Sequence, residues 1–268
     1  MIEQDIQIRM ADGVADAVLY RPDRAGVWPG VLHLTDIIGI RPSHRSMARR
    51  LAEQGYVVVM PNVFFRTGRA PLFDSMPNMG DERTMKRFGE LKSPLTPEVM
   101  ERDASTYVDF LGGDSGVRPG PMGVVGYCFA GSMALRTAAA RPDRIAAMAS
   151  FHGGGLYTDS PASPHRLLPR VKAQLYFGHA VNDKGMPAEA IAGFERELSN
   201  WGGNFASESY EGSLHGWTVP DHPVYNHPQA ERAFGKLMEL FAATLGARAP
   251  VAPTDRRAHD GGAFFNQP

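Results

Sequence analysis

The sequence predicts an α/β fold, in which a mostly parallel central sheet carries an N-terminal antiparallel hairpin and helices on both faces. Short apolar segments typical of strands alternate along the chain with longer segments of helical periodicity. Such alternation is typical of parallel strands that are joined by helices. The segment Tyr56–Met60, YVVVM, is apolar at every position and is followed by Pro61. A strand of this kind is expected at the centre of a parallel sheet, buried on both faces.

The first elements follow from local patterns in the N-terminal part of the chain. Polar and apolar residues largely alternate in Ile2–Arg9 and in Val14–Tyr20, and a turn containing Ala-Asp-Gly separates them. We therefore expect an antiparallel hairpin. Gly30–Leu34 is a short apolar strand. A helix is predicted over Ser43–Gln54, with its first serine as the N-cap and a glycine directly after its end.

Residues 62–96 are predicted to be irregular, because they are rich in Pro, Gly, Met and Arg. So long a connection is uncommon unless it covers a site, and we expect it to be an active-site cover. Simple core packing under a long loop is the alternative for its apolar side chains. A helix is expected to open at Thr96–Pro97 and to reach about Leu111, with the proline at its first position. The apolar side chains of the expected cover are Phe64, Phe65, Phe73, Met76 and Met79.

The remaining chain continues the alternation of strands and helices. We predict a single domain over residues 1–248. Residues 249–268 are rich in proline, glycine and charge, and we expect them to form a loosely attached tail. The predicted strands are Met122–Val125, Ile145–Phe151, Ala173–Phe177 and Phe205–Tyr210, and the predicted helices are Ser132–Ala140, Pro187–Leu198 and Ala230–Leu245.

Composition excludes several classes of protein. The chain has 28 Lys and Arg against 29 Asp and Glu, so no basic field is available for a nucleic acid. No apolar run has the length of a membrane span, and the first residues are charged, unlike a secretory signal. A single cysteine cannot form an internal disulfide. We expect a cytoplasmic monomer or small homo-oligomer without nucleic-acid or membrane partners.

The single cysteine lies in the most informative segment, residues 121–131, which read PMGVVGYCFAG. Cys128 follows a short apolar strand and precedes a helical pattern, with Gly126, Ala130 and Gly131 at −2, +2 and +3. This is the pattern of a nucleophile elbow, with sulfur as the nucleophile. The neighbours must be small because the turn is sharp. A helix N-terminus favours a thiolate and offers N–H groups to an oxyanion, whereas an isolated cysteine is usually buried and inert.

A thiol nucleophile needs a base, and the base needs an orienting acid. Asp183 lies just past the strand 173–177 in YFGHAVNDKGMP, and His215 lies past Tyr210 in YEGSLHGWTVPD. Both loops leave the carboxyl edge of the sheet, where active sites of α/β sheets assemble. The alternatives are a turn-forming aspartate and a loop histidine. His152, which precedes a Gly-Gly-Gly turn, is expected just behind the site, and no pair among His33, His152 and His179 has metal-ligand spacing.

At these positions the sequence resembles the dienelactone hydrolase family of α/β-hydrolases. The family's elbow reads G-x-C-x-G-G, its acid motif is an Asp followed by a hydrophobic residue and Pro, and its base motif is G-x-x-H-x-F/W. The resemblance covers about residues 1 to 245, with alanine at one elbow glycine. The matching residues are Gly126, Cys128, Ala130 and Gly131 in the elbow, Asp183, Met186 and Pro187 in the acid motif, and Gly212, His215 and Trp217 in the base motif.

The resemblance implies roles for residues near the thiol. In the segment LTDIIGIRP, Asp36 stands where the family has a glutamate that interacts with the thiol, so it is expected to contact the thiol or to lie just behind it. Aspartate is one methylene shorter than glutamate. The backbone N–H groups of Ile37 and Phe129 would form the oxyanion hole.

The resemblance also implies how substrate is bound. The family holds a substrate carboxylate with two arginines, one of which matches Arg83 in the segment Asp-Glu-Arg. The second arginine lies four residues after the catalytic histidine, and Val219 occupies that position here. Losing one bidentate arginine weakens a preference for acidic lactones. Trp217 is the other expected substrate-binding residue.

These observations predict a hydrolase that opens a lactone or cleaves a carboxylic ester through a Cys-His-Asp triad and a thioester intermediate. No cofactor and no metal are expected. One alternative is a general thiol-type carboxylesterase or thioesterase without a preference for acidic lactones, which Val219 favours. Another is a thiol redox or sensor protein on the same fold. The lack of a second, resolving cysteine argues against that alternative.

Overall fold

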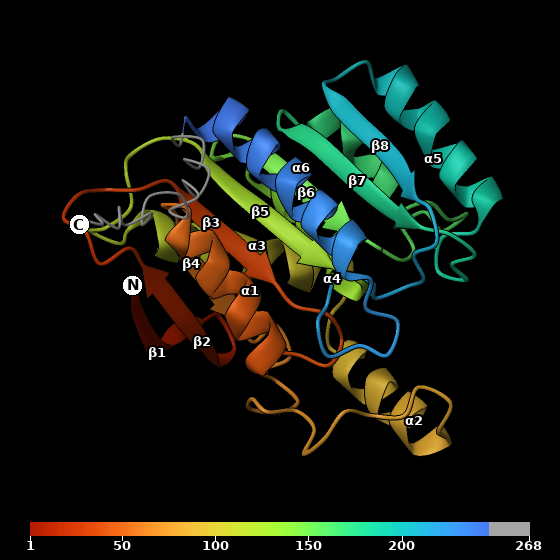
Figure 1. The fold of residues 1–268 in the computed structure, drawn as a ribbon, viewed down its shortest axis with the longest axis horizontal. Coiled ribbons are helices and arrows are strands. Elements are labelled where there is room, and N and C mark those ends of the chain that lie inside the picture. Colours follow the sequence, from red (N-terminus) through yellow and green to blue (C-terminus); the bar gives the residue numbers. More distant parts are fainter. Residues whose placement is uncertain (247–268) are drawn as a thin grey trace, which may run out of the picture.

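Eight strands form one sheet in the order β1-β2-β4-β3-β5-β6-β7-β8 in the computed structural model, which describes residues 1–246 (Figure 1). β1 pairs antiparallel with β2, and β2 pairs antiparallel with β4. All other neighbouring strands are parallel, which confirms the predicted fold class. The strands are β1 (Ile2–Met10), β2 (Gly13–Arg21), β3 (Gly30–Leu34), β4 (Val57–Pro61), β5 (Met122–Tyr127), β6 (Ile145–Phe151), β7 (Gln174–Ala180) and β8 (Phe205–Tyr210).

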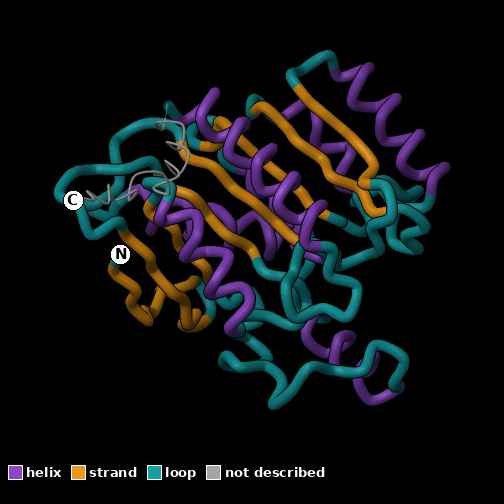
Figure 2. The backbone as a smooth tube through the Cα atoms, in the orientation of Figure 1, coloured by secondary structure: helices purple, strands orange, loops and turns teal. Residues whose placement is uncertain are grey.

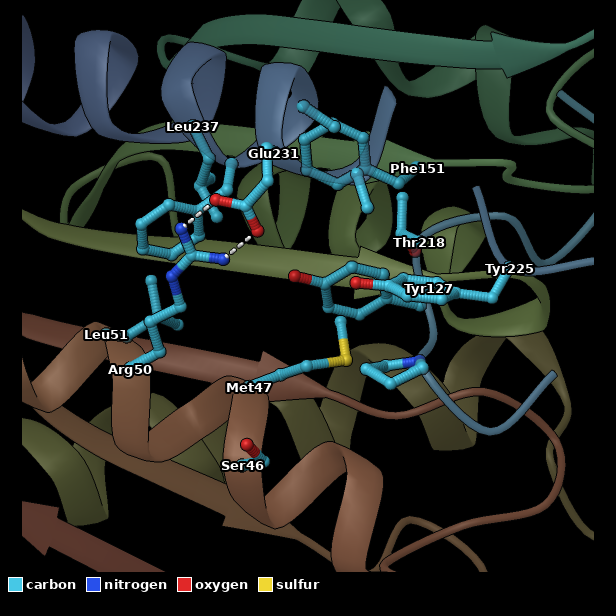
Figure 3. Close-up of a pocket in the computed structure, with 14 residues that line it drawn as sticks. Ser46, Met47, Arg50, Leu51, Tyr127, Phe151, Thr218, Tyr225, Glu231 and Leu237 are labelled. Carbon is cyan, nitrogen blue, oxygen red and sulfur yellow. Dashed lines mark hydrogen bonds and ion pairs between the residues drawn. The ribbon is translucent and has the colours of Figure 1, made fainter. Parts of the chain in front are cut away.

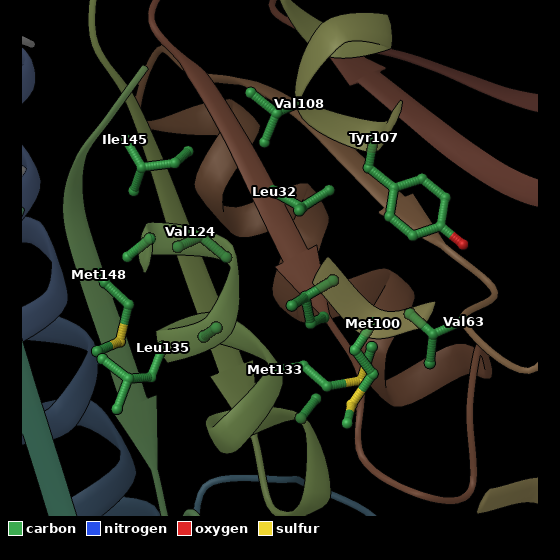
Figure 4. Close-up of a cluster of buried hydrophobic side chains, with 14 of the residues drawn as sticks. Leu32, Val63, Met100, Tyr107, Val108, Val124, Met133, Leu135, Ile145 and Met148 are labelled. Carbon is green, nitrogen blue, oxygen red and sulfur yellow. The ribbon is translucent and has the colours of Figure 1, made fainter. Parts of the chain in front are cut away.

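Helices cover both faces of this sheet (Figure 1). α1 (Pro42–Glu53) and α6 (His227–Leu245) pack on one face, and the opposite face is covered by α3 (Pro97–Gly112), α4 (Phe129–Ala140) and α5 (Ala188–Trp201). Each face has its own cluster of buried apolar side chains. Figure 4 shows part of the cluster on the face covered by α3, α4 and α5. There Leu32 and Val124 of the sheet lie among methionines and aliphatic residues of α3 and α4. Within residues 1–246, no helix has the length and hydropathy needed to cross a membrane.

The start of α1 differs from the prediction. The helix begins at Pro42, and Arg41 occupies the N-cap position without a side-chain capping bond. Ser43, the predicted N-cap, lies inside the first turn. Proline suits the first helical position because its missing N–H would have no acceptor there. The N-cap therefore lies two residues earlier than the serine suggested.

The prediction that residues 62–96 are wholly irregular is wrong, because they contain the helix α2 (Glu82–Lys92). Asp81 caps it by accepting a hydrogen bond from the backbone N–H of Thr84 at 3.4 Å. Phe88 and Leu91 are its buried apolar residues. The exposed positions of α2 are mostly charged. Its apolar pattern is therefore short and easily missed in the sequence. A 3₁₀-helix over Pro164–Arg170 also departs from the predicted elements.

The segment 62–96 extends from the edge of the sheet at which the parallel strands end (Figures 1 and 2). It starts directly after β4, at the carboxyl end of that strand. The ring of Phe64 stacks on the ring of Phe129, with 6.0 Å between the centroids. Leu72 packs against the turn after β3, where its Cδ1 lies 2.7 Å from the position of a Cβ added to Gly39. The segment therefore contacts both the cysteine turn and the turn after β3.

The connection from β5 to α4 is a sharp turn centred on Cys128, with φ 54° and ψ −124°. Its neighbours have no room for larger side chains. A Cβ on Gly126 would lie 2.1 Å from the carbonyl oxygen of Ala130, and a Cβ on Gly131 would lie 2.3 Å from Ser150 Oγ. Real Cβ contacts are never this short, so the turn can form only with small residues here. The strand–turn–helix order predicted for residues 121–140 is confirmed.

Two glycine substitutions test this packing. We expect Gly126→Ala to lower the free energy of unfolding by more than about 3 kcal/mol, because backbone atoms of the turn must move. Gly89 lies in α2 with nothing within 4 Å of an added Cβ, so Gly89→Ala should raise stability by about 0.5–1 kcal/mol. Urea unfolding measures both values. Equal effects of the two substitutions would contradict the packing argument.

Candidate active site

Three loops bring the predicted nucleophile, base and acid together. Cys128 lies at the N-terminus of α4, Asp183 follows β7, and His215 follows β8. His215 Nε2 lies 3.0 Å from Cys128 Sγ, and His215 Nδ1 lies 2.6 Å from Asp183 Oδ2. The two ring nitrogens thus join the sulfur to the carboxylate in one hydrogen-bonded chain. This arrangement can remove a proton from a thiol and orient the imidazole that holds it.

Asp183 is held as a carboxylate by its surroundings. Its side chain is 5% exposed, and Oδ1 accepts a hydrogen bond from the N–H of Gly185 at 2.7 Å. Burial acts to raise the pKa of Asp183, but the bond and charge of His215, with the Gly185 N–H, lower it below its usual value. The acid therefore stays ionised at neutral pH and fixes the orientation of the imidazole.

His215 is stabilised in its protonated form. Burial acts to lower the pKa of its imidazole, but the hydrogen bonds to Asp183 and Cys128, with the charges of both, raise that pKa to about 10. An imidazolium placed between a carboxylate and a sulfur stabilises the thiolate. The imidazole is thus held in its protonated form between the carboxylate and the sulfur.

His152 supports the cysteine turn from behind. The N–H of Cys128 donates to His152 Nδ1 at 3.1 Å and to the carbonyl of Phe151 at 3.1 Å. Burial holds the pKa of His152 well below its usual value, with the nearby His215 acting in the same direction. A neutral ring that accepts at Nδ1 carries its proton on Nε2. That nitrogen therefore donates to Thr218 Oγ1, 2.7 Å away.

Trp217 and Val219 are completely buried, so neither side chain has an exposed surface that a substrate could contact. The indole of Trp217 is 0% exposed and packs on the rings of His152 and Tyr210, with centroid distances of 5.1 and 4.9 Å. Val219 is also fully buried. In this structure Trp217 is a packing residue behind the imidazoles, whereas the resemblance suggested a contact with substrate.

Asp36 sits in a buried cluster of cationic and imidazole groups. Its carboxylate accepts from both terminal nitrogens of Arg41 at 2.7 and 2.8 Å, and it lies 3.2 Å from His44 Nε2 and 3.4 Å from His222 Nε2. Within residues 1–246 its polar contacts do not include the sulfur of Cys128. Burial opposes ionisation, but these partners hold the pKa of Asp36 well below its usual value. The shorter acid is thus bound by one guanidinium and two imidazoles.

The same carboxylate shapes the turn that carries Ile37. Asp36 Oδ1 accepts from the N–H of Ile38 at 3.0 Å, and the Asp36 carbonyl accepts from the N–H of Gly39 at 3.1 Å. The Ile37 N–H between them finds no acceptor in the described part of the chain. Phe129 is the first residue of α4, so its N–H has no partner inside the helix. Both N–H groups are available to an oxyanion.

Arg83 lies apart from these residues. It is an exposed residue of α2 and lines a surface hollow of about 570 Å³ that is bounded only by residues of the segment 72–90. None of the three hydrogen-bonded residues lines that hollow. The sequence match in the Asp-Glu-Arg segment therefore marks the start of α2, where Asp81 is the cap.

A separate hollow of about 210 Å³ lies between α1 and α6 (Figure 3). It is behind the cysteine turn, because Tyr127 in its wall directly precedes Cys128, and Thr218 in its wall bonds His152. The ion pair of Arg50 and Glu231 borders it. No residue of the Cys-His-Asp chain lines it.

No group of three or more His, Cys, Asp and Glu side chains within residues 1–246 is arranged to hold a metal ion. The expectations that the protein needs no metal or cofactor remain predictions from its sequence. Of the residues singled out there, the structure brings Cys128, His215 and Asp183 into contact and places Asp36 and Ile37 in the turn after β3. Sequence reasoning missed Arg41, His44 and His222 as partners of Asp36. His222 meets Asp36 across 186 positions of sequence, whereas Arg41 and His44 lie only 5 and 8 residues after it.

Known proteins resemble this chain over most of its length. Residues 15–245 match the model of the dienelactone hydrolase family. The chain is 31% identical over 232 residues to a carboxymethylenebutenolidase of Rhodococcus opacus, covering 83% of this chain and 84% of the relative. The sequence match therefore spans all of the elements from β2 to α6.

Solved structures share the same fold. A dienelactone hydrolase-like promiscuous phosphotriesterase from metagenomic libraries matches with a TM-score of 0.73 at 16% identity, covering 91% of this chain and 98% of that one. The dienelactone hydrolase of Anabaena variabilis matches with a TM-score of 0.62 at 19% identity, with coverages of 91% and 98%. The chain belongs to the dienelactone hydrolase family of α/β-hydrolases, and it is a hydrolase that acts on ester or lactone bonds.

Proposed function

We propose that the protein opens lactones or cleaves carboxylic esters with Cys128 as nucleophile, His215 as proton carrier and Asp183 as orienting acid. The observation that carries this proposal is the hydrogen-bonded chain from Sγ through the imidazole to the carboxylate, with 3.0 and 2.6 Å contacts. A nucleophile, its base and an orienting group in this order define the chemistry of acyl transfer.

The first step forms a thioester. The thiolate of Cys128 adds to the carbonyl carbon of the substrate, and the carbonyl oxygen takes up the negative charge. The N–H groups of Ile37 and Phe129 hold that oxyanion. When the tetrahedral intermediate collapses, the carbon–oxygen bond to the leaving alkoxide breaks, and the alkoxide takes the proton from His215. In a lactone the alcohol formed stays attached to the acyl group.

The second step removes the acyl group. His215 is now neutral, so it accepts a proton from a water molecule while the water oxygen adds to the thioester carbon. The intermediate expels the Cys128 thiolate and leaves a carboxylic acid, and the imidazolium once more faces the sulfur. An alkoxide or enolate is easily expelled by a thiol nucleophile, whereas an amide nitrogen is a harder leaving group. Esters and lactones are therefore favoured over peptides.

Removing the sulfur tests the nucleophile. We expect Cys128→Ala to reduce turnover of 4-nitrophenyl acetate by at least about 10³-fold, while circular dichroism and thermal unfolding stay close to those of the wild type. Rapid acid quench of the wild type with this ester should give an adduct at Cys128 by mass spectrometry. His227→Asn, at the exposed start of α6, is the control for the loss of a histidine. Undiminished turnover in Cys128→Ala would end the proposal.

The charge state of His215 is measurable by NMR. Its pKa of about 10 arises from Asp183 and Cys128, so Asp183→Asn and Cys128→Ala should each lower that pKa towards the ordinary value near 6.5. Because the imidazolium is lost above this pKa, kcat/KM of the wild type should fall as the pH rises through about 10. A His215 pKa that stays at the wild-type value in both variants would show that neither partner holds the proton.

A further inference from the structure

A hollow of about 300 Å³ borders the turn that carries Ile37. Its walls come from three places: the turn after β3, the segment 71–76 and the loop after β8. Ile38, in the turn, directly follows the candidate oxyanion donor, and Leu72 packs against Gly39 of the same turn. The lining residues are Ile38, Ile40, Arg41, Pro42, Pro71, Leu72, Phe73, Asp74, Ser75, Met76 and Asp221.

The side chains of this hollow offer apolar contacts. Ile38 and Ile40 line it and are almost completely buried. Leu72, Phe73 and Met76 line it from the segment 71–76. The ring of Phe73 also packs edge-on against Phe88 of α2, with 5.7 Å between the centroids. Apolar walls of this kind gain by enclosing hydrocarbon groups.

The only cation in the lining, Arg41, is already neutralised. Its guanidinium bonds both oxygens of Asp36 at 2.7 and 2.8 Å and both oxygens of Asp221 at 2.8 and 3.0 Å. Two carboxylates thus share one guanidinium, and Asp74 adds a further carboxylate to the lining. The lining is therefore negative, and a substrate carboxylate would lose its water there without gaining a free cation.

Within residues 1–246, no lysine and no second arginine lines this hollow. Val219 is buried and apolar, and Arg83 lines a different hollow, from which the turn after β3 is absent. Neither Arg83 nor Val219, which stand at the positions of the two family arginines, therefore supplies a cation for a substrate carboxylate in this hollow.

The geometry required by the first step indicates which substituent of the carbonyl carbon can reach the hollow. The leaving oxygen must face His215 Nε2 to receive its proton, and the carbonyl oxygen must face the N–H groups of Ile37 and Phe129. The acyl group is the remaining substituent of the carbonyl carbon. Ile38, which directly follows the Ile37 donor, lines the hollow, so an acyl group that passes this turn meets the hollow.

We infer that this hollow binds an uncharged, apolar acyl group, so that the substrates are neutral alkanoyl-type esters or lactones and acidic ones are disfavoured. This assignment rests on the proposed function, since it takes Ile37 as an oxyanion donor. Residues Ile38, Leu72, Phe73 and Met76 determine the preference, and the paired Arg41 does not recognise a carboxylate.

Two esters of equal shape test the inference. 4-Nitrophenyl 6-methylheptanoate ends in an isopropyl group, and 4-nitrophenyl hydrogen adipate ends in a carboxylate of the same shape. We expect kcat/KM of the wild type to be at least about tenfold higher for the neutral ester, because a desolvated carboxylate is costly without a partner. Rates with Cys128→Ala provide the background for both esters.

Two lysine substitutions locate the effect. Met76 lines the hollow, whereas Met85 is a 55% exposed residue of α2 that does not line it. Met76→Lys should reduce the neutral-to-acidic ratio at least about fivefold, because its ammonium pairs with the adipate carboxylate. Met85→Lys should change the ratio less than about twofold, because its charge is exposed and screened. Asp74→Asn is a second variant that should also raise activity on the acidic ester.

The outcomes separate the inference from the proposed function. Equal or faster turnover of the acidic ester by the wild type would overturn the inference while leaving the thiol mechanism standing. Equal responses to Met76→Lys and Met85→Lys, with no response to Asp74→Asn, would show that the acyl group lies elsewhere. Wild-type rates no higher than those of Cys128→Ala on every ester would overturn both.

Discussion

The left-handed backbone at Cys128 is the constraint on which the rest of the site depends. A non-glycine residue in this strained conformation costs about 1–3 kcal/mol, and surrounding contacts must hold it. Here the Cys128 N–H donates to Phe151 and His152, and its carbonyl accepts from the N–H of Gly131 at 3.0 Å. These bonds point the sulfur out of the sheet, to where the loops after β7 and β8 deliver Asp183 and His215. The absence of side chains at Gly126 and Gly131 lets strand and helix approach closely enough to form the turn.

Two buried aspartates near the cysteine turn have opposite surroundings and different roles. Asp183 faces one imidazole, and that imidazole shares its second nitrogen with the sulfur. Asp36 faces two imidazoles and a guanidinium that it shares with Asp221. Its hydrogen bond to the Ile38 N–H shapes the turn that carries the candidate oxyanion donor. Asp36, which the sequence resemblance suggested as a partner of the thiol, thus stabilises the backbone of the turn after β3.

The segment 62–96 connects the cysteine turn to the space where we propose the acyl group lies. Phe64 packs on Phe129, Leu72 packs on Gly39, and Phe73 packs on Phe88 of α2. This one segment thereby contacts the two turns that carry the candidate oxyanion donors, Ile37 and Phe129, and it lines the apolar hollow. The methionine of this segment that lines the hollow, Met76, suits a wall that encloses hydrocarbon, because the flexible methionine side chain adapts to groups of varied shape.

Local signals in the sequence were enough to predict the alternation of strands and helices, the sharp turn at Cys128, and the pairing of Cys128 with His215 and Asp183. Each depends on a short-range requirement, such as small residues beside a strained turn or a loop at the end of a strand. Tertiary structure decided the features that depend on distant contacts. Arg41 binds Asp221 across 180 positions of sequence, so the guanidinium beside Asp36 already has a second carboxylate partner. Packing against His152 and Tyr210 buries Trp217. Charge pairing and burial are properties of neighbours in space, so a motif can name a residue without revealing which groups surround it.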